Sequence, residues 1–419
     1  MKCSGMRFVS PTYTRPIWAE ISASRLVANF RALQAAAGPQ VEMLAVIKAD
    51  AYGHGATECA PVLAGAGARW LGVTSVEEGV AVRQSLGVLP QGVSPRVLVM
   101  CGVWPGEEAG VIERGLTPVV WEPYHLDLLE TEAKRCGLPP QSVAVHIEVD
   151  TGMARQGVPP GVLLDRLLRR FAADSPLLLE GVMTHLASTE VADDSQNQQQ
   201  MEDFAKALQQ VAEAGLRPHY VHAGNTSSTD SGFMPHALPA LAVSLGAQAM
   251  TRAGLSLYGY ALPLETMHPE GEGVPPHVAS RLLPVMAWKT RVVSLREVGR
   301  GTTVGYNATF VAPETMRLAL LPVGYADGFR RGLSSSNAQP GGDVLLHGRR
   351  TPIVGRVSMD LTVVDVTGIP ETAIGDEVVL IGTCGTEAIG ADDHARVAGT
   401  SVYEVLCGIS DRVPRVVVP

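Results

Sequence analysis

Eight short β-rich runs alternate with longer helical patterns between about residue 42 and residue 260, and no other feature constrains the fold as strongly. Alternating strands and helices are typical of βα units around a parallel sheet. Eight units favour a closed (β/α)8 barrel. An open doubly wound sheet is the alternative, but the first βα turn lacks the Gly-x-Gly-x-x-Gly pattern. The predicted strands are residues 42–49, 70–76, 97–102, 116–121, 143–149, 179–185, 220–223 and 250–258.

After about residue 284 the pattern changes to β runs with no long helices between them, which predicts a separate all-β domain. Residues 262–280 are rich in proline, glycine and acidic side chains, as expected of a linker. We therefore expect residues 18–270 to form the barrel and residues 271–419 the β domain. Residues 1–17 are expected to pack with the β domain.

The composition argues against several classes of protein. A net charge of −9 disfavours nucleic acid and anionic membranes as partners, because both select dense basic patches. The six cysteines form no Cys-x-x-Cys pair, and the histidines and carboxylates lack ligand spacing, so neither a disulfide framework nor a metal site is predicted. No run of about 18 apolar residues predicts a membrane helix. The expectation is a soluble, cytoplasmic protein.

Lys48 ends the first apolar strand pattern and is followed at once by the residues ADAYGHG. A lone lysine in such a place is most often a surface residue that caps a strand. Burial at a strand end can instead destabilise the ammonium form of a lysine, and the free amine forms Schiff bases with carbonyl compounds such as pyridoxal phosphate. Tyr52 and the neighbouring glycines, which let backbone approach a ligand closely, favour this second interpretation.

Further polar residues follow the predicted strands at the points where the strands end. Catalytic residues of such barrels lie at the carboxyl ends of the strands. Each residue alone is more readily explained as a satisfied core histidine or a surface ion pair, but that explanation does not account for their common position at one rim. These residues are Asp150, Thr151, Arg155, His185, His222, Asn225 and Arg252, with Gly254 and Leu255 following Arg252.

The sequence around Lys48 resembles the cofactor-lysine motif of alanine racemases, and eight further motifs agree with that family in order along residues 16–415. Agreement over nearly the whole chain is highly specific. The motifs are VDTGMAR (149–155), MTHLA (183–187), HAGNTS (222–227), RAGLSLYG (252–259), GYNAT (305–309), PVGYADG (322–328), GRVSMD (355–360) and DRVPR (411–415).

The resemblance implies pyridoxal 5′-phosphate bound to Lys48, and a head-to-tail homodimer whose active sites are shared between the two chains. Hydroxyls and backbone amides suit the phosphate. Arg252 is the implied partner of the pyridine nitrogen. Because a guanidinium keeps its proton, the ring remains a weaker electron sink, which favours racemisation over transamination. The residues implied to hold the cofactor are Lys48, Tyr52, Arg155, His185, His222, Asn225, Thr226, Arg252, Gly254, Leu255 and Tyr403.

Racemisation needs one base on each face of the substrate α-carbon, and the resemblance implies Lys48 and Tyr306 for these roles. A tyrosine is ordinarily too weak an acid to serve as a base near neutral pH without help. The resemblance supplies that help as a hydrogen-bonded chain from Tyr306 through His185 to Arg252 and His222. On spacing alone, Tyr306 would be interpreted as a half-buried surface tyrosine of the β domain.

The amino-acid substrate is expected to contact both domains. The resemblance implies that Arg155 and the Met359 amide bind the substrate carboxylate. Residues implied at the entrance or pocket wall are Tyr325, Asp360 and Tyr403.

Two positions depart from the family's pattern. Glu148 stands where many members have a carbamylated lysine, and we expect its carboxylate to hold Arg155 in place permanently. The alternation of side chains along a strand places Glu148 inside the barrel, where an unpaired carboxylate would be costly. Ser358 stands where a cysteine is common, which affects the pocket wall more than the reaction.

The favoured function is interconversion of L-alanine and D-alanine, which would supply cell-wall synthesis in a bacterial host. A racemase of broader specificity, acting on serine or longer side chains, would use the same residues and differ only in its pocket. A non-catalytic pyridoxal-phosphate carrier on the same barrel generally lacks the β domain. A decarboxylase of related architecture usually pairs the pyridine nitrogen with a carboxylate, whereas Arg252 stands there in this sequence.

Overall fold

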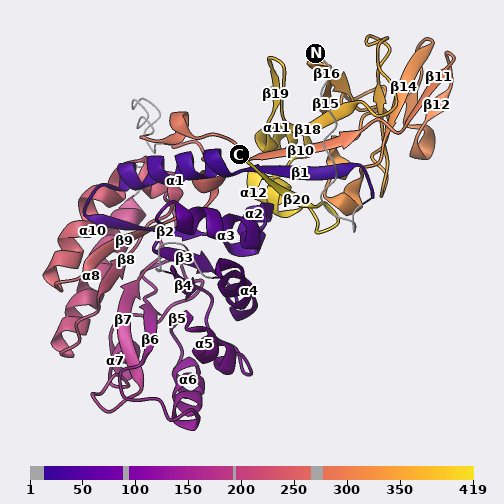
Figure 1. The fold of residues 1–419 in the computed structure, drawn as a ribbon. Helices are drawn as coiled ribbons and strands as arrows, with labels where there is room; N and C mark the ends of the chain where they lie inside the picture. Colours follow the sequence, from indigo (N-terminus) through magenta and orange to yellow (C-terminus); the bar gives the residue numbers. More distant parts are fainter. Residues whose placement is uncertain (1–13, 88–93, 192–194, 266–276) are drawn as a thin grey trace. The chain divides into compact units, whose positions relative to one another are not determined.

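The computed structural model describes residues 14–87, 94–191, 195–265 and 277–419 (Figure 1). It divides into two compact units, one of Ala23–Val285 and one of the residues up to Ser22 together with Met286–Pro419. Residues 1–13, which we expected to pack with the β domain, and much of the predicted linker lie outside the described residues.

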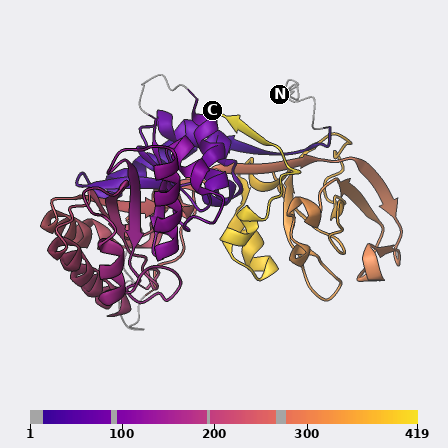
Figure 2. The ribbon, with the colours of Figure 1, turned by 90° about the horizontal axis from the view of Figure 1, so that it is seen from below.

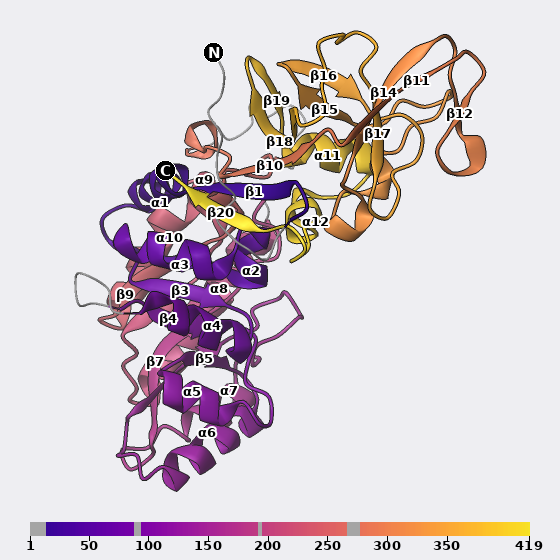
Figure 3. The same cartoon turned by 45° about the vertical axis from the view of Figure 1, so that its right-hand side comes forward.

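Eight parallel strands close into a barrel in the first unit, and helices alternate with them along the chain (Figures 1 and 3). The predicted (β/α)8 barrel is therefore confirmed. Strands covered on both faces are expected to be apolar throughout, and β3 and β5 are buried at every residue. The strands are β2 (Val41–Val46), β3 (Trp70–Val73), β4 (Arg96–Val99), β5 (Thr117–Val120), β6 (Val143–Glu148), β7 (Leu177–Met183), β8 (Tyr220–His222) and β9 (Gln248–Ala253).

Seven of the eight predicted strands are longer than the observed ones, and the first and the last of them border residues of the predicted site. The first was expected to extend to residue 49, but β2 ends at Val46 because the backbone turns in the left-handed sense after Lys48. The last was expected to extend to residue 258, but β9 ends at Ala253. Beyond Gly254, the residues Leu255–Tyr258 form the 3-10 turn η1.

Helices lie around the barrel strands (Figure 2), and α1 and α8 each bury one set of side chains. In α8, for example, Met201, Phe204, Leu208 and Val211 recur at helical spacing and are buried. Within the described part of the chain, no helix has both the length and the apolar character needed to cross a membrane. The helices are α1 (Ala23–Ala37), α3 (Ala56–Gly65), α4 (Val76–Leu86), α5 (Glu108–Arg114), α6 (Pro123–Arg135), α7 (Val162–Leu168), α8 (Ser195–Glu213) and α10 (Phe233–Ser244).

The second unit is mostly β, as predicted, with the two short helices α11 (Ala391–Ala398) and α12 (Val402–Cys407). Its largest sheet has the order β16-β15-β18-β10-β1-β20, and β19 pairs with β18. Two smaller sheets have the orders β11-β14-β17 and β12-β13. The strands are β1 (Ile17–Ser22), β10 (Met286–Arg291), β11 (Ser294–Val298), β12 (Thr303–Val304), β13 (Phe310–Val311), β14 (Met316–Leu321), β15 (Asp343–Leu346), β16 (Arg349–Pro352), β17 (Thr362–Asp365), β18 (Glu377–Cys384), β19 (Glu387–Ile389) and β20 (Arg415–Val418).

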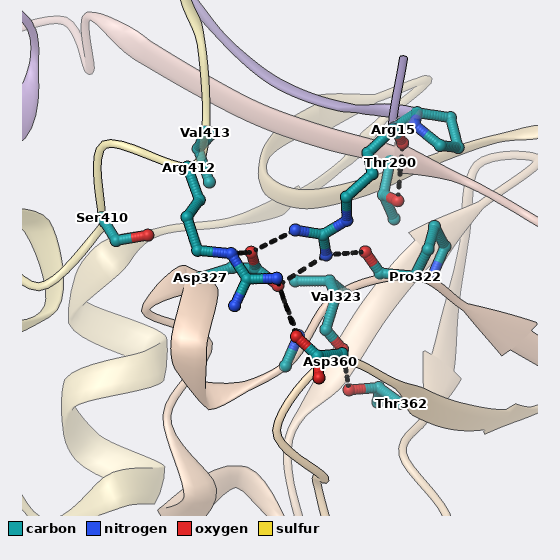
Figure 4. Close-up of polar contacts among 12 residues, drawn as sticks. Arg15, Thr290, Pro322, Val323, Asp327, Asp360, Thr362, Ser410, Arg412 and Val413 are labelled. Atoms are coloured by element: carbon teal, nitrogen blue, oxygen red, sulfur yellow. Dashed lines mark hydrogen bonds and ion pairs between the residues drawn. The ribbon is translucent and has the colours of Figure 1, made fainter. Parts of the chain in front are cut away.

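The segment that precedes the barrel belongs to this sheet. β1 pairs antiparallel with β10 and parallel with β20. Just before β1, Arg15 donates two hydrogen bonds to the carboxylate of Asp327, at 2.8 and 3.0 Å, and one to the Pro322 carbonyl (Figure 4). The Asp327 side chain is fully buried and also lies 3.4 Å from Arg412 Nε. A buried carboxylate with two arginine partners thus fixes the start of β1 to the second unit.

Candidate active site

Lys48 lies two residues after the end of β2 and begins α2 (Lys48–Gly53), a turn whose backbone is left-handed from Ala49 to Tyr52. Ala49, Asp50, Ala51 and Tyr52 have φ values of 50–54° and ψ values of 42–51°. Each L residue in this conformation costs about 1–2 kcal/mol, so the surrounding contacts must hold the turn. The lysine is therefore presented by a backbone segment that its own sequence does not favour.

Two carboxylates stabilise this left-handed turn. Glu78, in the first turn of α4, accepts hydrogen bonds from the amides of Ala49 at 2.7 Å and Thr74 at 2.8 Å. Asp50 accepts one from the Ala56 amide at 2.7 Å. Sequence analysis predicted loop backbone after the lysine but not the hand of the turn, because alanine and tyrosine seldom adopt it.

A group of hydroxyls and one close backbone amide lies beside Tyr52. A Cβ atom at Gly254 would stand 2.3 Å from the Tyr52 hydroxyl oxygen, so only glycine fits there. The Gly254 amide donates to Thr226 Oγ1 at 3.3 Å, and that oxygen lies 3.0 Å from Ser256 Oγ. Sequence analysis missed Ser256, which lies within the RAGLSLYG motif. This cradle of Tyr52, Thr226, Gly254 and Ser256 offers the donors that a phosphate requires.

The other predicted cofactor residues occupy three different elements. Asn225 caps α9 (Thr226–Asp230), and its side chain accepts a hydrogen bond from the Ser228 amide at 3.2 Å. Leu255 begins η1 immediately after the cradle glycine. Tyr403 lies on α12 in the second unit.

Arg252 is buried on β9, and its guanidinium binds two histidines. It donates hydrogen bonds to His185 Nδ1 at 3.1 Å, to His222 Nδ1 at 3.3 Å and to the Thr184 carbonyl at 2.9 Å. Among the described residues, no carboxylate lies within ion-pair distance of this guanidinium. We call Arg252, His185 and His222 the Arg252 network. These three residues are hydrogen-bonded to one another through Arg252, as the resemblance implied.

The histidines of the Arg252 network are neutral. Burial, and then the positive charges of Arg252, Arg155 and Lys48, lower the pKa of His185 to about 3. Burial and the neighbouring His146 and Arg252 hold the pKa of His222 well below its ordinary value. Burial lowers the pKa of Arg252 to about 10, so the guanidinium keeps its charge at neutral pH. The positive charge of the network therefore resides on the arginine.

Glu148 ends β6 and is buried inside the barrel, as the side-chain alternation predicted. Its carboxylate accepts a hydrogen bond from Gln156 Nε2 at 2.5 Å, and Gln156 also donates to the Met100 carbonyl at 3.0 Å. Burial raises the pKa of Glu148, against the opposing effects of Gln156, Arg252 and Arg155. Arg155 thus acts on Glu148 through its charge, whereas the hydrogen-bonding partner is Gln156.

A turn after β6 explains why Gln156 rather than Arg155 reaches the carboxylate. The side chain of Asp150 accepts hydrogen bonds from the amides of Gly152, Met153 and Ala154 at 2.9–3.1 Å. Beyond this turn Arg155 is exposed and Gln156 is half-buried. The exposed guanidinium remains available to a ligand at the rim.

Apart from Tyr403, the predicted residues of the second unit lie on exposed segments outside its strands and α-helices. Tyr306 begins η3 (Tyr306–Ala308) and is 67% exposed. Tyr325 and Met359 are also exposed, and the Tyr325 amide donates to the Ser358 carbonyl at 3.0 Å. Asp360 accepts a hydrogen bond from Arg412 Nη2 at 2.7 Å (Figure 4).

Comparison with known proteins identifies the family. Residues 21–262 match the model of the alanine racemase N-terminal domain, and residues 285–417 match that of the alanine racemase C-terminal domain. The chain belongs to the alanine racemase family. It is 38% identical over 401 residues to an alanine racemase from Symbiobacterium thermophilum, covering 96% of this chain and 97% of the relative. It is likewise 38% identical to one from Halothermothrix orenii, covering 96% and 97% of the two chains.

Solved structures agree with this assignment. The alanine racemase from Streptomyces coelicolor has a TM-score of 0.82 and 32% identity, with 96% of this chain and 98% of that chain covered. An alanine racemase from Bacillus anthracis, solved with bound L-Ala-P, has a TM-score of 0.79 and 29% identity over 98% and 96% of the two chains. The family consists of pyridoxal-phosphate-dependent isomerases, so the predictions of an enzyme and of its family are confirmed.

Proposed function

We propose that the protein is a racemase that interconverts L-alanine and D-alanine with pyridoxal 5′-phosphate as cofactor. The observation that carries this proposal is the buried Arg252, whose guanidinium is bound by two neutral histidines. No carboxylate of the described residues forms a hydrogen bond or an ion pair with this guanidinium. An enzyme that needed a protonated pyridine nitrogen would place a carboxylate there instead.

The residues present fit the cofactor. The cradle of Tyr52, Thr226, Gly254 and Ser256 would hold the phosphate, and the missing side chain of Gly254 lets the Tyr52 hydroxyl lie against the backbone there. Lys48 would hold the carbonyl carbon, and Arg252 the ring nitrogen. When bound, the pyridoxal ring would delocalise the negative charge that develops at the substrate α-carbon. Because Arg252 does not transfer its proton to the ring nitrogen, this delocalisation would be limited.

The proposed bases are Lys48 of one subunit and Tyr306 of the partner subunit, one for each face of the substrate. His185 Nδ1 accepts a hydrogen bond from Arg252, so a neutral His185 carries its proton on Nε2. That N–H can donate to the phenolic oxygen of the tyrosine and stabilise its ionised form. The exposure of Tyr306 within its own chain supports a role toward a second chain in a homodimer.

Arg155 and the Met359 amide are the proposed partners of the substrate carboxylate. Tyr325, Asp360 and Tyr403 are the proposed residues of the entrance and pocket wall. Glu148 is a proposed support: its charge acts on Arg155 and Arg252, and Gln156 holds it in place.

Two measurements test this proposal on the purified protein. Borohydride reduction after addition of pyridoxal 5′-phosphate, followed by peptide mapping, should place the label on Lys48. Incubation with a panel of L-amino acids, followed by chiral chromatography, should show alanine as the best substrate. Label on another lysine would refute the cofactor assignment, and faster racemisation of serine or longer side chains would replace alanine by a broader specificity.

A further inference from the structure

A second group of polar residues continues from the Arg252 network into the interior of the barrel. His222 Nε2 lies 2.8 Å from His146 Nδ1, on β6. His146 Nε2 lies 3.5 Å from a carboxylate oxygen of Glu180, on β7. The same carboxylate accepts two hydrogen bonds from Arg96, at 2.7 and 2.6 Å. Three side chains, those of His222, His146 and Glu180, thus join Arg252 to Arg96, which stands at the opposite, amino-terminal end of its strand.

The fold makes room for this arrangement. A Cβ atom at Gly181 would stand 2.5 Å from His146 Nδ1, so the ring occupies space that any other residue would fill. The rings of Trp70 and Tyr220 contact each other and pack against His146, at centroid distances of 5.4 and 6.1 Å from its ring. His146 is fully buried and Glu180 nearly so. The His146 ring is therefore closely packed on the side of Gly181.

The hydrogen-bonding partners fix the tautomer of each histidine. A guanidinium only donates, so His222 Nδ1, which contacts Arg252, must be an acceptor without a proton. A neutral His222 therefore carries its proton on Nε2 and donates to His146 Nδ1. His146 must then carry its own proton on Nε2, the nitrogen that lies 3.5 Å from the Glu180 carboxylate. A proton on His146 Nδ1 would place two donors against each other.

The electrostatic surroundings agree with these tautomers. Burial lowers the pKa of His146, so the ring is neutral at neutral pH. Burial would raise the pKa of Glu180, but its contacts with His146 and Arg96 outweigh burial and hold it at about 2. The charge of Arg96, in turn, keeps the carboxylate ionised and oriented.

We propose that His146 and Glu180 are positioning residues for the racemase reaction: they fix His222 as the Nε2–H tautomer, so that its Nδ1 orients the guanidinium of Arg252. Arg252 then donates to both His185 and His222, and His222 donates in turn to His146. This inference extends the proposed function and rests on it for its catalytic consequence. The tautomers themselves follow from the barrel alone.

Nitrogen-15 NMR of histidine-labelled, full-length protein without cofactor tests the tautomers directly. His222 and His146 should both show an unprotonated Nδ1 and a protonated Nε2, and His222→Gln and His146→Gln proteins assign the two sets of signals. A proton on Nδ1 of either ring, or a doubly protonated ring at neutral pH, would overturn the proposal. This readout does not require racemase activity.

The Glu180→Leu and Glu180→Gln variants test the catalytic consequence. Leucine removes the acceptor for His146 Nε2–H, so kcat for alanine should fall about tenfold with little change in KM, and Nδ1–H signals should appear. Glutamine retains an acceptor oxygen and should restore most of the parent kcat and the parent tautomers. Melting temperatures identify any variant that fails to fold. If Glu180→Leu fails to fold, Gly181→Ala, which displaces the His146 ring, replaces it.

Glu42→Leu is the matched control, because Glu42 lies on barrel strand β2 and pairs with Arg69 outside the network. It should leave both kcat and the histidine signals unchanged. Parent-like kcat in Glu180→Leu would overturn the positioning role. A parent protein with the expected tautomers and no racemase activity would refute the proposed function instead, and would leave the tautomer assignment standing.

Discussion

The two proposed bases stand in opposite surroundings. Lys48 lies on the barrel rim among residues that are already fixed, with a buried Arg252, two neutral histidines and the cradle around Gly254. Tyr306 lies on an exposed 3-10 turn of the second unit, and 67% of its surface is accessible. One half of the proposed site is therefore preorganised within a single chain, whereas the other half, under the proposed function, would gain its surroundings from a partner.

The two surroundings share one feature. Lys48 is followed by four residues with left-handed backbone, and Tyr306 is followed by Asn307 and Ala308, whose φ values are 62° and 50°. In both places a non-glycine residue with positive φ lies directly after the proposed base. Strain next to a reactive side chain fixes the direction in which that side chain leaves the backbone.

Mixing two inactive variants is the strongest way to break the comparison. Lys48→Ala and Tyr306→Phe should each lose nearly all racemase activity. After subunit exchange, random pairing should restore about a quarter of the parent activity, because half of the dimers are hybrid and each hybrid has one intact site. A mixture of Lys48→Ala with the Lys48→Ala/Tyr306→Phe double variant should remain inactive. Confirmed exchange without restored alanine racemisation would show that the two bases belong to one chain.

The Glu148→Gln variant measures how much the buried carboxylate contributes to the preorganised half of the proposed site. Loss of the charge beside Arg155 and Arg252 should lower kcat/KM for alanine about tenfold, and the parent should show no activation by bicarbonate. Near-parent kinetics in the variant, or bicarbonate activation of the parent, would refute the proposed support. Glu42→Gln, whose carboxylate is also partly buried with a raised pKa, should keep the parent kinetics.

The same variant predicts a dependence of stability on pH. The pKa of Glu148 is raised in the folded protein, so its contribution to stability is complete below its ordinary pKa and is lost as the pH rises through the folded value. Glutamine has no such loss. For the cofactor-free proteins, the melting temperature of Glu148→Gln minus that of the parent should therefore be about 2–4 °C higher at pH 8 than at pH 5. An equal difference at both pH values would contradict a raised pKa.

Ala49→Gly gives the smallest expected effect and compares the two left-handed turns. Ala49 is exposed, and glycine removes strain of about 1–2 kcal/mol while costing about 0.5–1 kcal/mol in entropy, so the free energy of unfolding should rise by about 0.5–1 kcal/mol. Ala308→Gly should behave alike. Ala35→Gly, at an exposed position of the right-handed helix α1, should be destabilising by about 1 kcal/mol. Destabilisation of Ala49→Gly by a similar amount in urea denaturation would contradict the left-handed turn.

The sequence predicted the features that depend on local periodicity and on order along the chain. The barrel, its carboxyl rim and the inward direction of Glu148 follow from strand alternation, and the structure agrees with them. The pairing of Glu148 with Gln156 could not be predicted, because it depends on the turn around Asp150. The contact of His146 with Glu180 depends on the register between β6 and β7, which places Gly181 opposite the histidine. The periodicity of apolar residues along each strand does not determine the register between two strands.

The left-handed turn after Lys48 also limits how the lysine motif can be moved between proteins. The stretch KADAYG, cut from its barrel, would relax to right-handed or extended backbone, because its alanines and tyrosine prefer those conformations. The amine and the Tyr52 hydroxyl would then leave the segment in different directions. A designer who grafts this motif onto a new scaffold must therefore also transfer the Glu78 carboxylate that receives the Ala49 amide and the gap at Gly254 that receives the tyrosine.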